Sequence, residues 1–417
     1  MRSSIGIHTA NMFKKTTLRE SKALYNDFEK YGKETGELSV RPNRERKPPP
    51  NADPFTQQLY SNMSKYYRAG YTDNDKGLRW DMRRSKHSPG YIRPQDDDKP
   101  CSIKFKVTPK VFVGDNDYLT SATENDLDDV RALFNAETGK ISPLLGNFDS
   151  YAFNRIDYCF YADTEELKLG CTPKQLMTLF KRGNIPNGFR EPKMFNKKDK
   201  KNKSYKNSLY LVNKSNSMAI NCYCKDDQLK QKYPNNPSLE DSRNGIRFEI
   251  QFKYPRVYAV SRNVKEEVKN EYGLYDNAEV ITKMLSDNFC EYVVQKYFHR
   301  IIGQGDFITL NAARWIVEQH HFRKDKEERL IWTLEKINEC RGIAKAKAKI
   351  PSGDLNDFTR SLKDLDAILV NPVTIPREWG IEHIPNPLRA YYSIAFEESF
   401  VFGNERRFNE LLAEYLT

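Results

Sequence analysis

One strand-like run of this chain carries a cation and a carboxylate on the same side. In residues 245–252, GIRFEIQF, the polar Arg247 and Glu249 alternate with apolar residues. Because successive side chains of a β-strand point to opposite faces, this run predicts a strand with one apolar and one polar face. A polar strand face is most often solvated surface. A second run, residues 154–163, has the same alternation and carries Asp157 on its polar face. Two such strands indicate the alternative, that their polar faces form a functional site.

A tyrosine lies in a third strand-like run, between the other two in the sequence. Tyr223 belongs to residues 218–225, MAINCYCK, and Lys225 follows it two positions later. Along a continuous strand Lys225 would point to the same side as Tyr223. If the strands pair in one sheet, Asp157 and Glu249 can approach and bind one Mg²⁺ or Mn²⁺ ion through hard oxygen ligands.

These residues form the set that a metal-assisted phosphoryl transfer to tyrosine needs. The cation would orient the phosphate and neutralise its charge, while the phenol oxygen of Tyr223 would attack in line and form a phosphotyrosine. Such a bond conserves the phosphodiester energy, so a broken strand can be rejoined. Each residue also has an ordinary interpretation. A strand tyrosine is usually a core aromatic, and Asp157 could pair with Arg155 or Arg247 in a ladder of charges.

The elements that must position these residues are strands in the first part of the chain and helices in the last. This order predicts an α+β fold, with an antiparallel-rich sheet and flanking helices followed by a helical C-terminal region. Threonine and proline start signals predict helices over 123–134 and 172–180. Three segments are expected: a flexible basic, proline-rich segment 1–53, a catalytic domain 54–305, and a helical region 306–417 that is a candidate DNA-binding or accessory domain.

The charge balance favours a polyanionic partner. The chain has 68 Lys and Arg against 57 Asp and Glu, a net charge of +11, and basic proteins gain affinity for nucleic acid by releasing its counterions. The lysine-rich residues 193–206 are either a solvated loop or a phosphate-contacting one.

Seven irregularly spaced cysteines indicate reduced thiols. No signal peptide or membrane-spanning apolar run is evident, so we expect a soluble, cytoplasmic protein without membrane contact.

Three motifs, taken in order, resemble the trans-acting rolling-circle replication initiators of plasmids, phages and integrative elements. The motifs are N-R-I-D-Y-C at 154–159, I-N-C-Y-C-K at 220–225 and I-R-F-E-I-Q at 246–251. In that family an R-I-D strand, a strand ending in Y-x-K and an R-F/I-E strand recur in this order. The resemblance covers roughly residues 100–265 and extends loosely to the tail. The order of the motifs is its specific part, since each motif alone is degenerate.

The resemblance implies a DNA nickase that breaks and rejoins one strand by transesterification, as an endonuclease and a ligase. It would form a 5′-phosphotyrosine and leave a 3′-hydroxyl for a polymerase. Carried over to this sequence, the roles are a nucleophile at Tyr223, metal ligands at Asp157 and Glu249, and supporting charges at Lys225 and Arg247. Two features depart from the family: Cys224 stands where an acidic residue is more frequent, and Tyr210 is a rival nucleophile.

The resemblance also implies partners, and the residues leave other functions open. The expected partner is origin DNA, single-stranded or supercoiled, together with a host helicase and polymerase, and a homodimer is an open alternative. A repressor or partition factor would bind DNA without a metal or a covalent product. A conjugative relaxase would use the same chemistry, and an RNA-binding or structural protein would present stacking aromatics instead.

Overall fold

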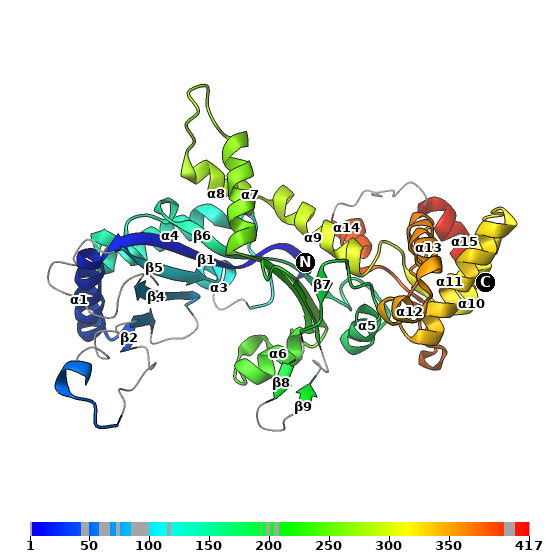
Figure 1. Ribbon diagram of the computed structural model, residues 1–417, viewed down its shortest axis with the longest axis horizontal. Coiled ribbons are helices and arrows are strands. Elements are labelled where there is room, and N and C mark those ends of the chain that lie inside the picture. Colours follow the sequence, from blue (N-terminus) through cyan, green and yellow to red (C-terminus); the bar gives the residue numbers. More distant parts are fainter. Residues whose placement is uncertain are drawn as a thin grey trace. The chain divides into compact units, whose positions relative to one another are not determined.

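The computed structural model describes residues 2–42, 50–57, 67–71, 76–84, 100–114, 118–192, 194–196, 201–203, 208–395 and 405–416. Its main feature is a ten-stranded sheet (Figure 1). The order of its strands is β2 (Leu38–Pro42), β3 (Tyr67–Tyr71), β4 (Leu78–Arg84), β5 (Pro100–Val107), β1 (Ser4–Thr17), β6 (Ala152–Asp163), β12 (Gly245–Lys253), β11 (Met218–Cys224), β10 (Ser208–Asn213) and β7 (Phe189–Arg190). Two-stranded sheets are formed by β8 (Met194–Asn196) with β9 (Lys201–Lys203), and by β13 (Phe307–Ile308) with β14 (His383–Ile384).

Helices fill most of the remaining described chain. The longer ones are α1 (Leu18–Thr35), α4 (Leu127–Ile141), α7 (Tyr254–Glu267), α9 (Asp287–Ile301), α10 (Leu310–Gln319), α11 (Lys324–Cys340), α13 (Leu355–Ala367) and α15 (Glu405–Leu416). The shorter ones are α3 (Pro109–Val113), α5 (Pro173–Phe180), α6 (Lys225–Lys232), α8 (Asn277–Leu285), α12 (Ile343–Lys349) and α14 (Pro387–Ala395). The predicted α+β class with a helical C-terminal region is confirmed.

The chain divides into two compact units, each assembled from separate segments. Unit 1 contains residues 1–5, 159–250 and 291–417, and unit 2 contains residues 6–158 and 251–290. The helical region beyond residue 306 therefore belongs to unit 1. These units do not follow the three segments expected from the sequence, whose functional roles stay predictions.

The N-terminal segment differs from the flexible stretch expected over residues 1–53. Residues Ser4–Thr17 form β1, which pairs antiparallel with β5 and stands between β5 and β6 in the sheet. Its apolar side chains, such as Met12, are buried. The prediction was wrong because polar residues of β1, among them Thr9 and Thr16, are buried as well, so the apolar pattern is weak in the sequence. Residues 43–49 of the expected basic linker lie outside the described residues.

Aromatic pairs form the core of unit 2. The ring of Trp80 on β4 lies 5.3 Å from Phe28 of α1 and 5.4 Å from Phe105 of β5. Phe105 in turn lies 5.1 Å from Phe134 of α4. The two pairs of Phe105 are edge to face, a geometry that the aromatic quadrupole favours, whereas Phe28 is tilted against Trp80. The apolar face of the strands is thereby covered by α1 and α4, which leaves the opposite face of these strands to polar side chains.

In unit 1, one aromatic side chain of α9 holds the sheet and a helix together. Phe298 lies 5.9 Å from Phe160 of β6, 5.3 Å from Phe248 of β12 and 5.7 Å from Phe180 of α5. The predicted helix at 172–180 is confirmed as α5, with Thr172 capping its start. The apolar faces of β6 and β12 are therefore fixed in this core, and their polar faces carry the candidate site.

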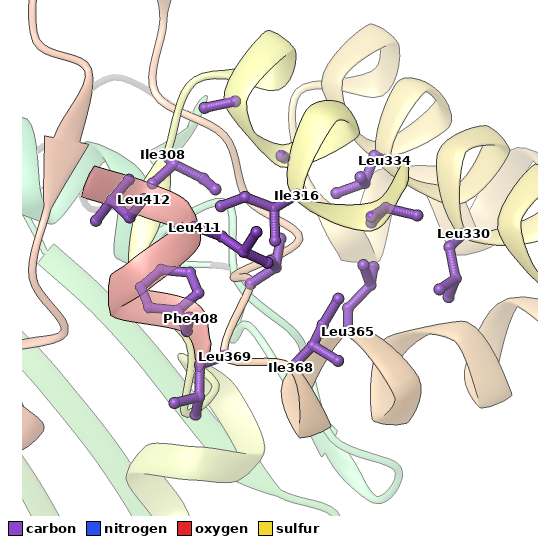
Figure 2. Close-up of a cluster of buried hydrophobic side chains, with 14 residues drawn as sticks. Ile308, Ile316, Leu330, Leu334, Leu365, Ile368, Leu369, Phe408, Leu411 and Leu412 are labelled. Atoms are coloured by element: carbon purple, nitrogen blue, oxygen red, sulfur yellow. The ribbon is translucent and has the colours of Figure 1, made fainter. Parts of the chain in front are cut away.

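A separate apolar cluster holds the C-terminal helices together (Figure 2). It combines side chains of β13, α10, α11, α13 and α15. Phe408 and Leu411 of α15 lie inside it, with Leu365 of α13 and Ile316 of α10 also buried there. The last described helix is thus part of the folded core of unit 1.

We expect Phe408→Ala to lower the free energy of unfolding by about 3–5 kcal/mol, because the substitution leaves a cavity in a closely packed core. Urea denaturation monitored by circular dichroism measures this change. Leu416→Ala on the same helix is the matched control, since Leu416 is exposed and its loss should cost less than about 0.5 kcal/mol. Equal effects of the two substitutions would contradict the packing of α15 described here.

Candidate active site

A short hydrogen bond joins the predicted nucleophile to one predicted carboxylate. The phenol hydroxyl of Tyr223, on β11, donates to Oε1 of Glu249, on β12, at 2.5 Å. Both residues are buried, with Tyr223 9% exposed. β11 and β12 are neighbours in the sheet. The alternation read from the sequence therefore does bring Tyr223 and Glu249 together on one face.

A buried arginine completes this group. Arg247 lies two residues before Glu249 on β12 and is fully buried. Its guanidinium carbon lies 5.7 Å from the centre of the Tyr161 ring. At this distance a cation is attracted to the ring face. Gly245 makes room for that ring, because a Cβ atom at residue 245 would collide with the phenol of Tyr161.

The surroundings of Tyr223 keep its phenol protonated. Burial is the largest influence on its pKa, followed by the negative charge of Glu249, and together they raise the pKa well above 10 despite the opposing Arg247. Burial acts to lower the pKa of Arg247, but Tyr223, Cys159 and Glu249 outweigh it and raise that pKa. Tyr223 therefore holds its proton at neutral pH, with Glu249 placed to accept it.

The rival tyrosine lies on the same sheet face as Tyr223. In the antiparallel pairing of β10 with β11, Ser208 stands opposite Tyr223 and Tyr210 opposite Asn221. Opposed residues share a face, and so do residues two apart on a strand. Tyr210 is only half-buried, so it is more accessible than Tyr223. Burial alone therefore leaves Tyr210 as an alternative nucleophile.

Lys225 is placed differently from the sequence expectation. β11 ends at Cys224, and Lys225 is the first residue of α6. Strand alternation therefore does not carry Lys225 to the side of Tyr223. Its side chain is buried and its ammonium donates to Oε1 of Gln228 at 2.8 Å, one turn along the same helix. The two acidic residues that follow, Asp226 and Asp227, offset its unfavourable charge at the helix start.

Asp157 is held by the arginine two residues before it. Nε and Nη2 of Arg155 donate to the two carboxylate oxygens of Asp157 at 2.7 Å each. This is the ordinary interpretation that the sequence left open. Arg155 and Asp157 belong to unit 2, whereas Glu249 and Tyr223 belong to unit 1. The approach of Asp157 to Glu249 stays a prediction.

The donor atoms suit a hard cation in kind, but other side chains occupy them in this structure. Arg155 occupies both oxygens of Asp157, and the hydroxyl of Tyr223 occupies one oxygen of Glu249. Within the part of the chain that the structure describes, no three His, Cys, Asp or Glu side chains are grouped to hold a metal ion. Mg²⁺ binds through carboxylates that are free to coordinate it, so an ion would have to displace Arg155 or Tyr223 from these oxygens.

Sequence reasoning missed Tyr161 as a member of this group. The signal was present, because Tyr161 continues the alternation of Asp157 and Cys159 on β6. Its hydroxyl is buried and makes no hydrogen bond within the described residues. This hydroxyl could therefore form a hydrogen bond with a polar group that bound beside Arg247.

In the lysine-rich run 193–206, only the backbone of β8 and β9 is described, and the contact of that run with phosphate stays a prediction.

Comparisons with known proteins find likeness among solved structures alone. No family model and no curated relative matches the chain. Among solved structures, the chain is similar to a rolling-circle replication initiator protein from Geobacillus stearothermophilus, with 12% sequence identity and a TM-score of 0.30 over 71% of this chain and 86% of that chain. None of the described helices is long and apolar enough to cross a membrane.

We expect Arg155→Met to lower the free energy of unfolding by about 1–3 kcal/mol, because it removes the bidentate partner of a buried carboxylate. Arg155 is itself 36% exposed, so water can replace part of the lost bond. Denaturation with urea measures the change. Arg243→Met, which breaks an exposed pair with Glu240, is the control and should cost less than about 1 kcal/mol. A larger loss for the control would contradict a structural role for Arg155.

Proposed function

We propose that this chain is a DNA strand nickase and strand transferase that acts through Tyr223, in the manner of a rolling-circle replication initiator. The observation that supports it most is the buried hydrogen bond from Tyr223 to Glu249 beside Arg247. A phenol with a carboxylate acceptor and a nearby fixed cation has the partners that an activated tyrosine nucleophile needs. The net charge of +11 suits a DNA substrate.

In the proposed reaction the phenol oxygen of Tyr223 attacks a backbone phosphorus while its proton passes to Glu249. A bond forms between this oxygen and phosphorus, and the bond from phosphorus to the 3′ oxygen breaks. The 3′ oxygen leaves and takes a proton from water to become a hydroxyl, and the 5′ phosphate stays bonded to Tyr223. Arg247 and the Tyr161 hydroxyl would stabilise the charge that develops on the phosphate oxygens. Attack by a 3′-hydroxyl reverses these steps and rejoins the strand.

Burial of Tyr223 sets a condition on this reaction. A phosphodiester has to reach the phenol oxygen, so neighbouring side chains must move when DNA binds. The same burial favours the second candidate function, a DNA-binding protein without catalysis, in which the Tyr223–Glu249 bond would only stabilise the sheet. A supercoiled origin substrate, a host helicase and polymerase, and a requirement for Mg²⁺ or Mn²⁺ remain part of the proposal.

We expect Tyr223→Phe to abolish nicking of a supercoiled plasmid that carries the gene and its flanking DNA, with a loss of about 10⁶-fold, the size seen when a covalent nucleophile is removed. Gel electrophoresis with and without Mg²⁺ or Mn²⁺ measures relaxation, and denaturing gels detect the protein-linked strand. Tyr210→Phe is the matched control and should keep full activity. The opposite pattern would transfer the role to Tyr210. If the wild type only shifts the plasmid under every metal, the binding-protein function replaces the nickase.

We expect Glu249→Gln to slow nicking by about 10²–10⁴-fold, the usual contribution of a general base. Because the pKa of Tyr223 is raised well above 10, its phenolate fraction below that pKa grows about tenfold per pH unit. The residual rate of the variant should therefore rise with pH by this factor, whereas the wild-type rate should not.

Glu240→Gln is the control for this experiment, since Glu240 is an exposed glutamate just before β12, and it should leave the pH profile unchanged. Recovery of Glu249→Gln by a higher concentration of Mg²⁺, without a pH slope, would instead identify Glu249 as a metal ligand.

A further inference from the structure

The outer face of the unit 2 sheet carries cations and an aromatic ring. In the register of β1 with β5, Phe13 stands opposite Lys104 and Asn11 opposite Lys106. In the register of β4 with β5, Arg79 also stands opposite Lys106. Opposed side chains share a face, and the alternate residues of these strands are buried in the core. Arg79 and Lys106 are exposed, as is Lys15 on β1.

Helix α7 adds two exposed rings to this face. Tyr254 and Tyr258 are 51% and 59% exposed, and residues four apart lie on the same side of a helix. Their ring centres are 6.1 Å apart. The ring of Tyr254 also lies 6.1 Å from that of Phe13, edge to face. The three rings therefore form a row that connects the outer sheet face with α7.

The same side of α7 continues with positive charge. Arg262 is exposed one turn beyond Tyr258. The ammonium of Lys265 lies 4.6 Å from the centre of the Tyr275 ring and bonds its hydroxyl at 3.0 Å. The acidic residues at the end of α7, Glu266 and Glu267, are each paired with a lysine. Because lysines neutralise these two glutamates, the positive charge of Arg262 lies beside the exposed rings without an opposing charge from Glu266 or Glu267.

Exposed apolar rings are concentrated in this part of the chain. Five of the eleven large hydrophobic residues that are exposed in the described structure lie between residues 254 and 275, on α7 and in the connection to α8 (Figure 1). Rings next to cations match an unpaired strand of nucleic acid, whose bases stack on aromatic side chains while its phosphates meet Lys and Arg. A duplex hides its base faces and would use only the cations.

We propose that this surface, formed by Lys15, Arg79, Lys106, Tyr254, Tyr258 and Arg262, binds single-stranded nucleic acid. Tyr254 and Tyr258 stack on two bases, and the cations contact the backbone. This site is distinct from the residues proposed for nicking, and it binds a strand whether or not Tyr223 reacts. A strand exposed near an origin is the substrate that such a surface would hold.

Fluorescence anisotropy of the full-length protein with labelled oligothymidylate of about 15 nucleotides, comparable to known single-strand site sizes, tests the proposal. We expect tighter binding than to a duplex of equal length. Tyr254→Ala and Tyr258→Ala should each weaken binding by roughly 5- to 150-fold, whereas Tyr→Phe at either position should keep it. Arg262→Gln should reduce the slope of log affinity against log salt by about 0.7, the value for one phosphate contact.

Tyr292→Ala in unit 1 is the matched control, because Tyr292 is 56% exposed and also lies under a lysine. It should leave oligothymidylate binding unchanged. A parallel titration with oligouridylate identifies the preferred sugar, and tight binding of either strand supports the site. Unchanged affinity in the Tyr254→Ala, Tyr258→Ala double variant, or equal affinity for the duplex, would overturn the proposal. Plasmid nicking is measured on the same variants. A variant that still nicks but binds oligothymidylate as tightly as the wild type would overturn the binding surface without affecting the nickase proposal.

Discussion

Charged side chains on covered strand faces depend on partners inside the protein, and this constraint shapes the candidate site. Leaving such a group unsatisfied costs several times what a typical hydrogen bond contributes. Glu249 meets the hydroxyl of Tyr223, Arg247 lies over the Tyr161 ring, and Asp157 is clamped by Arg155. The same bonds that stabilise the sheet therefore fix the geometry from which any chemistry of Tyr223 must start.

The two groups of tyrosines in this chain illustrate how one residue type serves opposite purposes. Tyr223 is buried, and burial raises its pKa, so any reaction of its oxygen would need help from a base. Tyr254 and Tyr258 expose their rings to solvent, so their faces rather than their oxygens are available. The chemistry proposed for Tyr223, in unit 1, would use the phenol oxygen, whereas the stacking proposed for Tyr254 and Tyr258, in unit 2, would use the ring faces.

Residue alternation predicted the strands of the site well and their surroundings less well. The polar faces of β11 and β12 follow from a period of two, and the pairing of Tyr223 with Glu249 agrees with it. The same alternation does not predict the position of Lys225, because β11 ends one residue earlier and a helix begins at Lys225. β1 was missed since its buried polar residues conceal its apolar pattern. Partner choice, such as Asp157 with Arg155, depends on side-chain geometry that spacing does not specify.

The division of the sequence between the two units bears on how the protein is made. The chain passes from one unit to the other four times, at residues 5/6, 158/159, 250/251 and 290/291. During synthesis unit 2 lacks its last segment until residue 290 has emerged from the ribosome, and unit 1 receives its final segment later still. Early strands such as β1 must therefore wait for distant partners, as in other folds dominated by non-local pairing, which fold slowly. Chaperones that shield unpaired strand edges would have their greatest effect in that interval.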